Sequence, residues 1–298
     1  VVTLELLSNN LVEPWLYGAS TGLSPVSVVV SAIFWTALWG PIGLVLATPL
    51  TVCFAVLGRH LPQLAWLDML LGNQPAFDPA TRLYQRLLAN DVEEAVEMAD
   101  EQIARNSPAA FYGDTGVPAL RLAALDQDRP SRVEQRYRVA TGMSALLRNL
   151  HGVHPAPLPG DATATVLCVG ARREIDTLAA EMLSHALAFE GVPTRVLPAS
   201  AVIADHIESL PLDGVRVLCL SSFGTAPEAQ LRFVARRLER QRPGLRIVAA
   251  LWNAPLALLT PEATAGLGVD AVAREFGEAL QRLRAGLEDA DDGVSAGR

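Results

Sequence analysis

The most prominent feature of the hydropathy pattern is an uncharged stretch near the start of the chain. Residues 14–58 contain no charged side chain, and the part from Val26 to Leu57 is almost wholly apolar. About 20 apolar residues suffice to cross a bilayer as a helix. A straight helix over Val26–Gly58 would be about 50 Å long, well beyond a hydrocarbon core of about 30 Å. The pattern therefore predicts a membrane α-helical segment that is either a kinked helix or a re-entrant pair.

Glycine and proline residues divide this stretch, because they weaken or interrupt helical hydrogen bonding. Pro25 stands at its start, where a first-turn proline favours a helix. Trp35 and Trp39 lie one turn apart, which suits either an interfacial aromatic anchor or packing against a neighbouring helix. The predicted helix breaks are Gly40, Pro41, Gly43 and Pro49.

Polar residues just before the stretch are candidates for a transport pathway. A carboxylate inside a membrane is costly and usually functional, so Glu13 is either a pathway residue or a helix-end residue among lipid headgroups. Asn9 and Asn10 suit hydrogen bonds beside a pathway or between packed helices, and Pro14 follows the carboxylate directly. We expect residues 1–60 to be the C-terminal part of a transmembrane domain whose larger part precedes Val1.

Amphipathic helices follow, and residues 61–150 predict a helical connector. Asp78 with Pro79, and then Asp91, mark two helix starts through N-capping side chains. Residues 151–164 are rich in proline and glycine without a helical or strand period, which indicates a linker. His151 and His154 have no other ligand-type residue near them in the sequence, so we expect solvated side chains and no metal site.

From residue 165 to 287, short apolar segments alternate with longer amphipathic helices. This alternation predicts a soluble α/β domain with a doubly wound parallel sheet, flavodoxin-like or cobalamin-binding-like. Residues 288–298 are polar, and we expect them to be disordered. The predicted strands are Thr165–Val169, Arg195–Leu197, Val215–Leu220, Leu245–Leu251 and a weaker Asp270–Val272.

Ligands of such folds bind at the carboxyl ends of the strands. Arg172 and Arg173 follow the first strand and suit an anion, whereas Ser221, Ser222 and Thr225 offer hydroxyl groups and a helix start after the third. Thr225 and Glu228 have the spacing of a capping box. The chain contains no Asp-x-His-x-x-Gly, no G-x-G-x-x-G and no lysine. A structural or assembly role is therefore favoured over a bound cofactor, and the serines have no nucleophile elbow that would indicate an enzyme.

Charge adds one exclusion. The formal net charge is −8, and the 24 basic residues, all arginine, form no stripe of the kind that binds nucleic acid. We therefore expect no nucleic-acid partner.

Several sequence elements in the first 60 residues together resemble the autoinducer-2 exporter family of bacterial permeases. They are Asn10–Gly18, Leu23–Val26, Phe34–Trp35, Trp39–Gly43 and Leu46–Thr51. The resemblance extends past the membrane segment and covers residues 1 to about 150, through Gly58–Pro62, Leu67–Asp68, Leu71–Gly72 and Tyr84–Leu88.

This resemblance implies a multi-pass inner-membrane protein in the lipid bilayer that moves a small solute, either a signal molecule or an ion. It further implies a cytoplasmic C-terminal domain, and self-association is an expectation for such permeases. The alternative hypothesis is a membrane-anchored regulatory or sensor protein whose α/β domain binds a small ligand. Neither hypothesis assigns catalysis to the chain.

Overall fold

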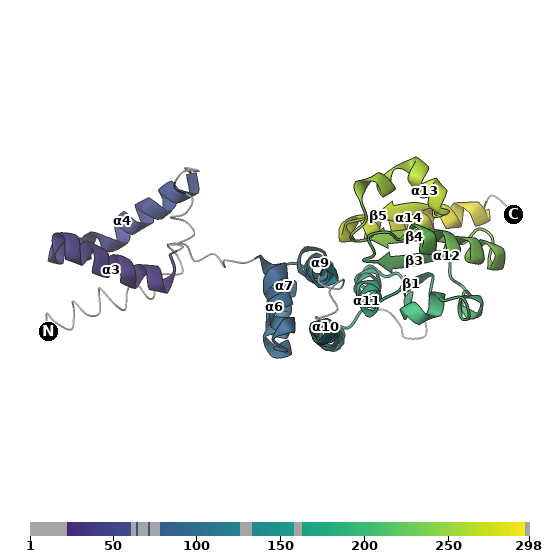
Figure 1. The fold of residues 1–298 in the computed structure, drawn as a ribbon, viewed down its shortest axis with the longest axis horizontal. Helices are drawn as coiled ribbons and strands as arrows, with labels where there is room; N and C mark the ends of the chain where they lie inside the picture. The colour runs from purple at the N-terminus through teal and green to yellow at the C-terminus, as the bar shows by residue number, and fades with distance from the viewer. Residues whose placement is uncertain are drawn as a thin grey trace. The chain divides into compact units, whose positions relative to one another are not determined.

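The computed structural model describes residues 23–60, 64, 71, 78–125, 133–157 and 163–295. The chain divides into two compact units, Val1–Asp78 and Pro79–Arg298 (Figure 1). Asn9, Asn10, Glu13 and Pro14, the predicted pathway residues, lie outside the described residues.

In its described residues, the first unit contains two helices in succession, α3 (Pro25–Trp39) and α4 (Pro41–His60). The Ser24 hydroxyl accepts a hydrogen bond from the amide of Ser27 at 3.0 Å and thereby caps α3, and Pro25 occupies the first turn as predicted. Gly40 separates the helices with φ of +65°, a conformation that glycine adopts without a steric penalty. Two helices with one break therefore replace the single kinked helix of the first alternative.

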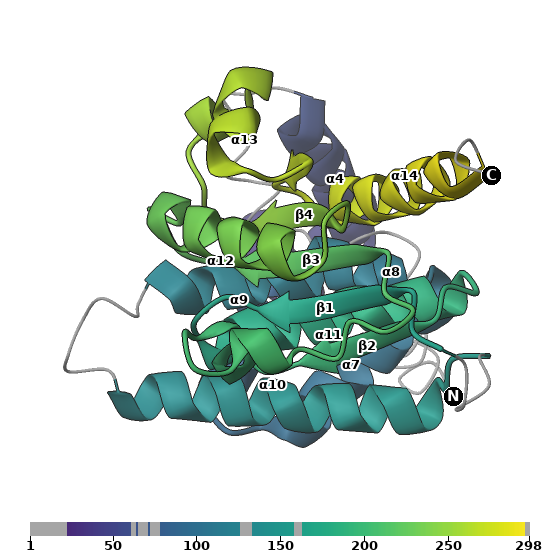
Figure 2. The ribbon, with the colours of Figure 1, turned by 90° about the vertical axis from the view of Figure 1, so that its right-hand side faces the viewer.

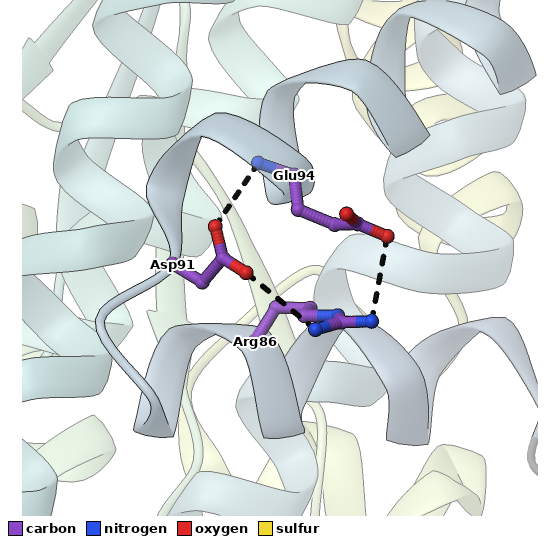
Figure 3. Close-up of polar contacts among 3 residues, drawn as sticks. All are labelled: Arg86, Asp91 and Glu94. Atoms are coloured by element: carbon purple, nitrogen blue, oxygen red, sulfur yellow. Dashed lines mark hydrogen bonds and ion pairs between the residues drawn. The ribbon is translucent and has the colours of Figure 1, made fainter.

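The second unit begins with a group of helices: α6 (Pro79–Leu88), α7 (Val92–Arg105), α8 (Pro108–Phe111), the π-helix η3 (Tyr112–Gly116), α9 (Val117–Leu125) and α10 (Val133–Val153). Asp91 caps α7 as predicted, because its carboxylate accepts from the Glu94 amide at 3.3 Å. Arg86 joins this corner through ion pairs to Asp91 at 3.5 Å and to Glu94 at 3.4 Å (Figure 3).

The α/β part carries the five strands that the alternating pattern predicts. They are β1 (Val166–Gly170), β2 (Thr194–Leu197), β3 (Val217–Ser222), β4 (Arg246–Leu251) and β5 (Ala271–Ala273). All pairs are parallel and the order is β2-β1-β3-β4-β5, so the chain reverses direction of winding between β1 and β3. This order is the flavodoxin-like one, and the predicted doubly wound sheet is confirmed.

The connecting helices are α11 (Glu174–Phe189), α12 (Glu228–Gln241), α13 (Pro261–Leu267) and α14 (Phe276–Ser295), with short 3₁₀ turns η5 (Ala199–Val202), η6 (Ile207–Ser209) and η7 (Leu256–Leu259). Helix α14 extends to Ser295, so residues 288–295 of the expected disordered tail are helical, and residues 296–298 lie outside the described residues. Leu287 packs on the core and Asp289 reaches Arg246 at 3.9 Å, contacts that favour continued helix.

Alternate residues of the strands face two different cores. Cys168 and Cys219 point to the face that α11 and α14 cover, whereas Leu167 and Leu218 point to the face that α12 covers (Figure 2). Both faces of a doubly wound sheet are buried, which explains the continuous apolar runs of β1 and β3.

The helical connector shares the first of these cores. Leu120 and Leu147 of the connector belong to the same buried cluster as Leu183 of α11 and Cys219 of the sheet. Helix α10 continues to Val153, three residues into the expected linker of 151–164, because Leu146, Leu147 and Leu150 continue its buried face. The connector and the α/β domain therefore form one unit instead of two modules joined by a free linker.

Candidate functional site

The turn between α3 and α4 places the predicted helix-breaking residues. Gly40 and Pro41 form the break, with the Gly40 amide donating to the Thr36 carbonyl at 2.8 Å. Gly43 and Pro49 lie inside α4, so they do not break the helix. Pro49 has no amide hydrogen and its ring crowds the carbonyl of the preceding turn, yet α4 continues on both sides of it.

Gly43 has a different role, which is close approach. A Cβ atom at this position would lie 1.9 Å from the carbonyl oxygen of Trp35. No side chain larger than hydrogen fits there without separating the two helices. The indole nitrogen of Trp35 donates to the Thr51 hydroxyl at 3.1 Å, and its ring stacks on Phe54 at 6.0 Å between centroids. For Trp35, packing on the neighbouring helix is therefore correct; Trp39, 53% exposed, is not buried by that contact.

In α3 and α4, small side chains are buried and large apolar side chains are exposed. Among their described side chains, the buried positions are all small: Ser27, Ser31, Gly43, Ala47, Thr51, Ala55 and Gly58. Large apolar side chains are exposed instead, including Ile42 and Val45 at 68% each. Small residues at intervals of four let helix backbones approach, as in membrane helix pairs, and exposed large apolar surface suits a lipid environment.

Length and composition give one helix that could cross a membrane. Within the described residues, Pro41–Gly58 is long and apolar enough, and Val26–Trp39 is apolar but shorter.

At the carboxyl ends of the strands, a buried carboxylate ties the loops together. Asp176, 1% exposed, lies in the first turn of α11 and accepts from the amides of Arg172 at 3.0 Å, Arg173 at 2.8 Å and Phe223 at 2.8 Å. Burial raises the pKa of this carboxyl group, and the three amide donors counteract that rise. Asp176 thus joins the loop after β1 to the loop after β3.

The hydroxyl groups predicted to meet a ligand are mostly engaged within the protein. Ser221 is fully buried, and its Oγ accepts from the indole nitrogen of Trp252 at 2.9 Å. The Ser222 hydroxyl accepts from the Gly224 amide at 3.1 Å. Thr225 is exposed and does not cap α12, which begins at Glu228 after Pro227, so the predicted capping box is wrong. The capping position is Pro227, so Thr225 lies too early in the chain for its hydroxyl to cap the first turn of α12.

Two further contacts close the strand-end region. The Gln230 side chain donates to the Ala171 carbonyl, and the side-chain amide of Asn253 donates to the Phe223 carbonyl at 3.3 Å. Of the predicted anion ligands, Arg172 is exposed and Arg173 is half-buried, and their amides serve Asp176. The structure brings the predicted loops together, and their polar groups hydrogen-bond to one another.

A second polar cluster lies where the connector meets α11. The Tyr112 hydroxyl and His185 Nδ1 are 2.7 Å apart, and His185 Nε2 is 2.9 Å from the His154 carbonyl. The rings of His151 and His185 lie 4.1 Å apart between centroids, and His154 contacts the Asp100 carboxylate at 3.1 Å. His151 lies in α10 and His154 is partly buried, so the expectation of solvated linker histidines is wrong.

Burial governs the protonation of this cluster. Desolvation lowers the pKa of His185 to about 4, with the neighbouring His151 adding to the effect, and burial also lowers the pKa of His151. Burial raises the pKa of the Tyr112 hydroxyl and of the Glu181 carboxyl group. The cluster is therefore uncharged at its centre near neutral pH. Among the described residues, no three His, Cys, Asp or Glu side chains are grouped to hold a metal ion.

Two sequence features point to several of these residues. Asp176 is an acid in the first turn of a helix that follows a strand, a favourable position next to amide donors. The stripe Gly43, Ala47, Thr51 and Ala55 repeats small residues every four positions. By contrast, Trp252 and Tyr112 have no local signal, because their partners lie 31 and 73 residues away.

Comparison with known sequences addresses the first unit. Residues 1–63 match the family model described as AI-2E family transporter. The match ends close to the end of α4, whereas the resemblance was expected to extend to about residue 150.

Curated relatives give similar coverage. A putative transport protein of Haemophilus influenzae is 32% identical over 77 residues, which are 26% of this chain and 22% of that protein. The AI-2 transport protein TqsA of Escherichia coli is 43% identical over 49 residues, 16% of this chain and 14% of that protein. This chain thus spans less than a quarter of the length of these relatives.

Solved structures similar to much of this chain are distant. The monomethylamine corrinoid protein of Methanosarcina barkeri is 15% identical with a TM-score of 0.49, over 67% of this chain and 94% of that protein. A cobalamin-binding protein of Desulfitobacterium hafniense is 12% identical with a TM-score of 0.32, over 69% of this chain and 97% of that protein. Likeness at this level carries no inference about a ligand. What the comparisons establish is that residues 1–63 of this chain match the AI-2E transporter family in sequence, with similarity to curated transport proteins over short segments.

Proposed function

We propose that this chain belongs to an integral inner-membrane transporter of the AI-2E type, which moves a small solute or an ion across the bilayer. The observation that carries the proposal is the coincidence of two features in residues 25–60. The AI-2E match covers these residues, and their two helices bury small side chains while exposing large apolar ones. Water would not favour such a surface, whereas lipid would.

In this proposal, α4 spans the bilayer and the shorter α3 packs against it. Helix α4 ends at Arg59 and His60, and an arginine beside a span favours the cytoplasmic side. The unit Pro79–Arg298 is then cytoplasmic. The strand-end loops of that unit have a structural role, because Asp176, Ser221 and Ser222 are engaged by protein donors.

Solute flux in vesicles tests the transport proposal. The full-length gene product is reconstituted, and efflux of autoinducer-2 and of protons is compared with empty vesicles. We expect flux of one of the two above the empty-vesicle level, and loss of that flux in Gly43→Leu, because leucine cannot fit beside the Trp35 carbonyl. The matched control is Val45→Leu on the exposed side of the same helix.

A wild-type protein that moves neither probe faster than empty vesicles would contradict the proposal. Glu13→Gln is measured in the same assay. Unchanged flux in that variant removes Glu13 from the pathway without affecting the proposal for the helix pair.

A further inference from the structure

A row of arginine side chains lines a groove between α12 and α13. Arg232, Arg236 and Arg240 follow each other at intervals of four residues and are exposed. The groove has a volume of about 580 Å³, a size typical of small-molecule sites. The rest of its lining consists of Ala235, Glu239, Ala265, Gly266, Leu267 and Gly268.

The groove is open above Gly266, where an added Cβ atom would meet nothing within 4 Å. At Gly268 the backbone has φ of +75°, which favours glycine, and an added Cβ atom would lie 3.3 Å from the Cβ of Ala235. A ligand can therefore reach the backbone of α13 as well as the arginines of α12. Successive arginines of the row lie about 6 Å apart along the axis of α12, because four helical residues rise by that distance.

Among the described residues, arginines near the arginine row have acidic partners, whereas those of the row do not. Arg237 on the same helix pairs with Glu208, and Arg246 pairs with Asp270 at 2.7 Å. Within the described ranges, by contrast, no ion pair or hydrogen bond connects the side chains of the arginine row to an acidic group. Like charges four residues apart on a helix destabilise it, so an anion bound in the groove would relieve that cost.

We propose that the groove between α12 and α13 binds a phosphate-bearing polyanion. Guanidinium groups bind phosphate oxygens in pairs of hydrogen bonds, and three flexible arginine side chains in a row can contact successive phosphates of one ligand. Glu239 is the single carboxylate in the groove and disfavours anions of high charge density near it. This site is separate from the strand-end loops and does not depend on the transport proposal.

The test uses the full chain in neutral detergent, with inorganic tripolyphosphate as the probe. Isothermal titration is expected to show one saturable site per chain. The triple variant Arg232→Gln/Arg236→Gln/Arg240→Gln is expected to bind at least about tenfold more weakly. Its matched control, Arg105→Gln/Arg138→Gln/Arg282→Gln, removes equal charge at exposed positions that pair with acids on their own helices, and is expected to bind as wild type does.

A second variant separates the site from folding effects. Gly266→Leu fills the groove without a clash, because the space above Gly266 is open, and it is expected to weaken binding without removing any charge. Gly277→Leu on α14, where the space is likewise open, is the control. Equal binding by wild type and both groove variants would overturn the proposal.

The source of the phosphate is distinguished by a parallel arm. Hydrogen exchange of residues 228–241 and 261–268 is followed in detergent micelles with and without an anionic phospholipid. Protection by lipid alone, lost in the triple variant, assigns the site to membrane headgroups, whereas binding of tripolyphosphate assigns it to a soluble ligand. If neither probe binds, the proposal is wrong.

Discussion

The helix pair of the first unit and the α/β part of the second are built in opposite ways. In α3 and α4 the small residues are inside and the large apolar residues are outside. In the α/β part the large apolar residues fill two cores on either side of the sheet. The helix pair depends on backbone approach at one glycine, whereas the α/β loops depend on a buried carboxylate. The two regions therefore bury side chains of opposite size.

The substitution with the largest expected effect is one that separates α3 from α4. Gly43→Leu places side-chain atoms on the Trp35 carbonyl, and a backbone atom cannot move aside as a flexible side chain can. We expect a cost of about 3 kcal/mol or more. Hydrogen exchange of residues 25–58 should lose protection, while residues 163–290 keep theirs. Retained protection in α3 and α4 would show that the helices do not approach as closely as the structure indicates.

The next effect breaks the α/β part and leaves the helix pair intact. Asp176→Ala removes the acceptor of three backbone amides in a buried place, and we expect a loss of about 3 kcal/mol. Asp176→Asn keeps one acceptor oxygen and should lose less. Urea unfolding with pulse proteolysis measures both, and an unchanged stability of the alanine variant would mean that water satisfies these amides.

Acid pH is expected to destabilise the second unit selectively, because the cluster around His185 lies in that unit. The folded pKa of His185 is about 4, below its ordinary value of 6.5. The unfolded chain therefore binds a proton first as pH falls below 6.5, and this group lowers stability progressively until about pH 4. Above pH 6.5 it has no effect, and at acid pH the loss reaches about 2–3 kcal/mol.

Other groups face His185, so the measurement is a difference. Tyr112, His151, His154, Asp100 and Glu181 contact or surround this cluster, and the raised pKa of Glu181 acts in the opposite direction. Urea unfolding of wild type and His185→Gln is compared between about pH 7 and pH 4. As pH falls, wild type should lose more stability than His185→Gln. A difference in unfolding free energy that stays constant with pH would contradict the lowered pKa of His185.

The smallest effect concerns the corner at Arg86. Asp91→Ala removes the cap of α7 and one ion pair, and we expect a loss of about 1 kcal/mol. Asp91→Asn keeps the cap and loses only the charge, so it should stay close to wild type. Thermal unfolding distinguishes them, and equal losses in both variants would assign the effect to the ion pair with Arg86.

Local patterns in the sequence determined much of this molecule. The sequence predicts the strands, the uncharged stretch, the break at Gly40 and Pro41 and the cap at Asp91. Each of these features depends on residues within a few positions of one another. The end of α10 and the extent of α14 were not, since buried leucines and a distant ion pair extend those helices beyond their polar sequence.

Only the tertiary structure decided how the site residues are used. Ser221 looked available in the sequence and is engaged by Trp252, and Gly43 looked like a helix break and is a contact. His154 looked solvated and contacts Asp100, 54 residues away. Hydropathy and capping are properties of neighbouring residues, whereas a buried donor finds its acceptor through the packing of whole elements. The sequence therefore predicts the elements, and their packing decides which polar groups remain free.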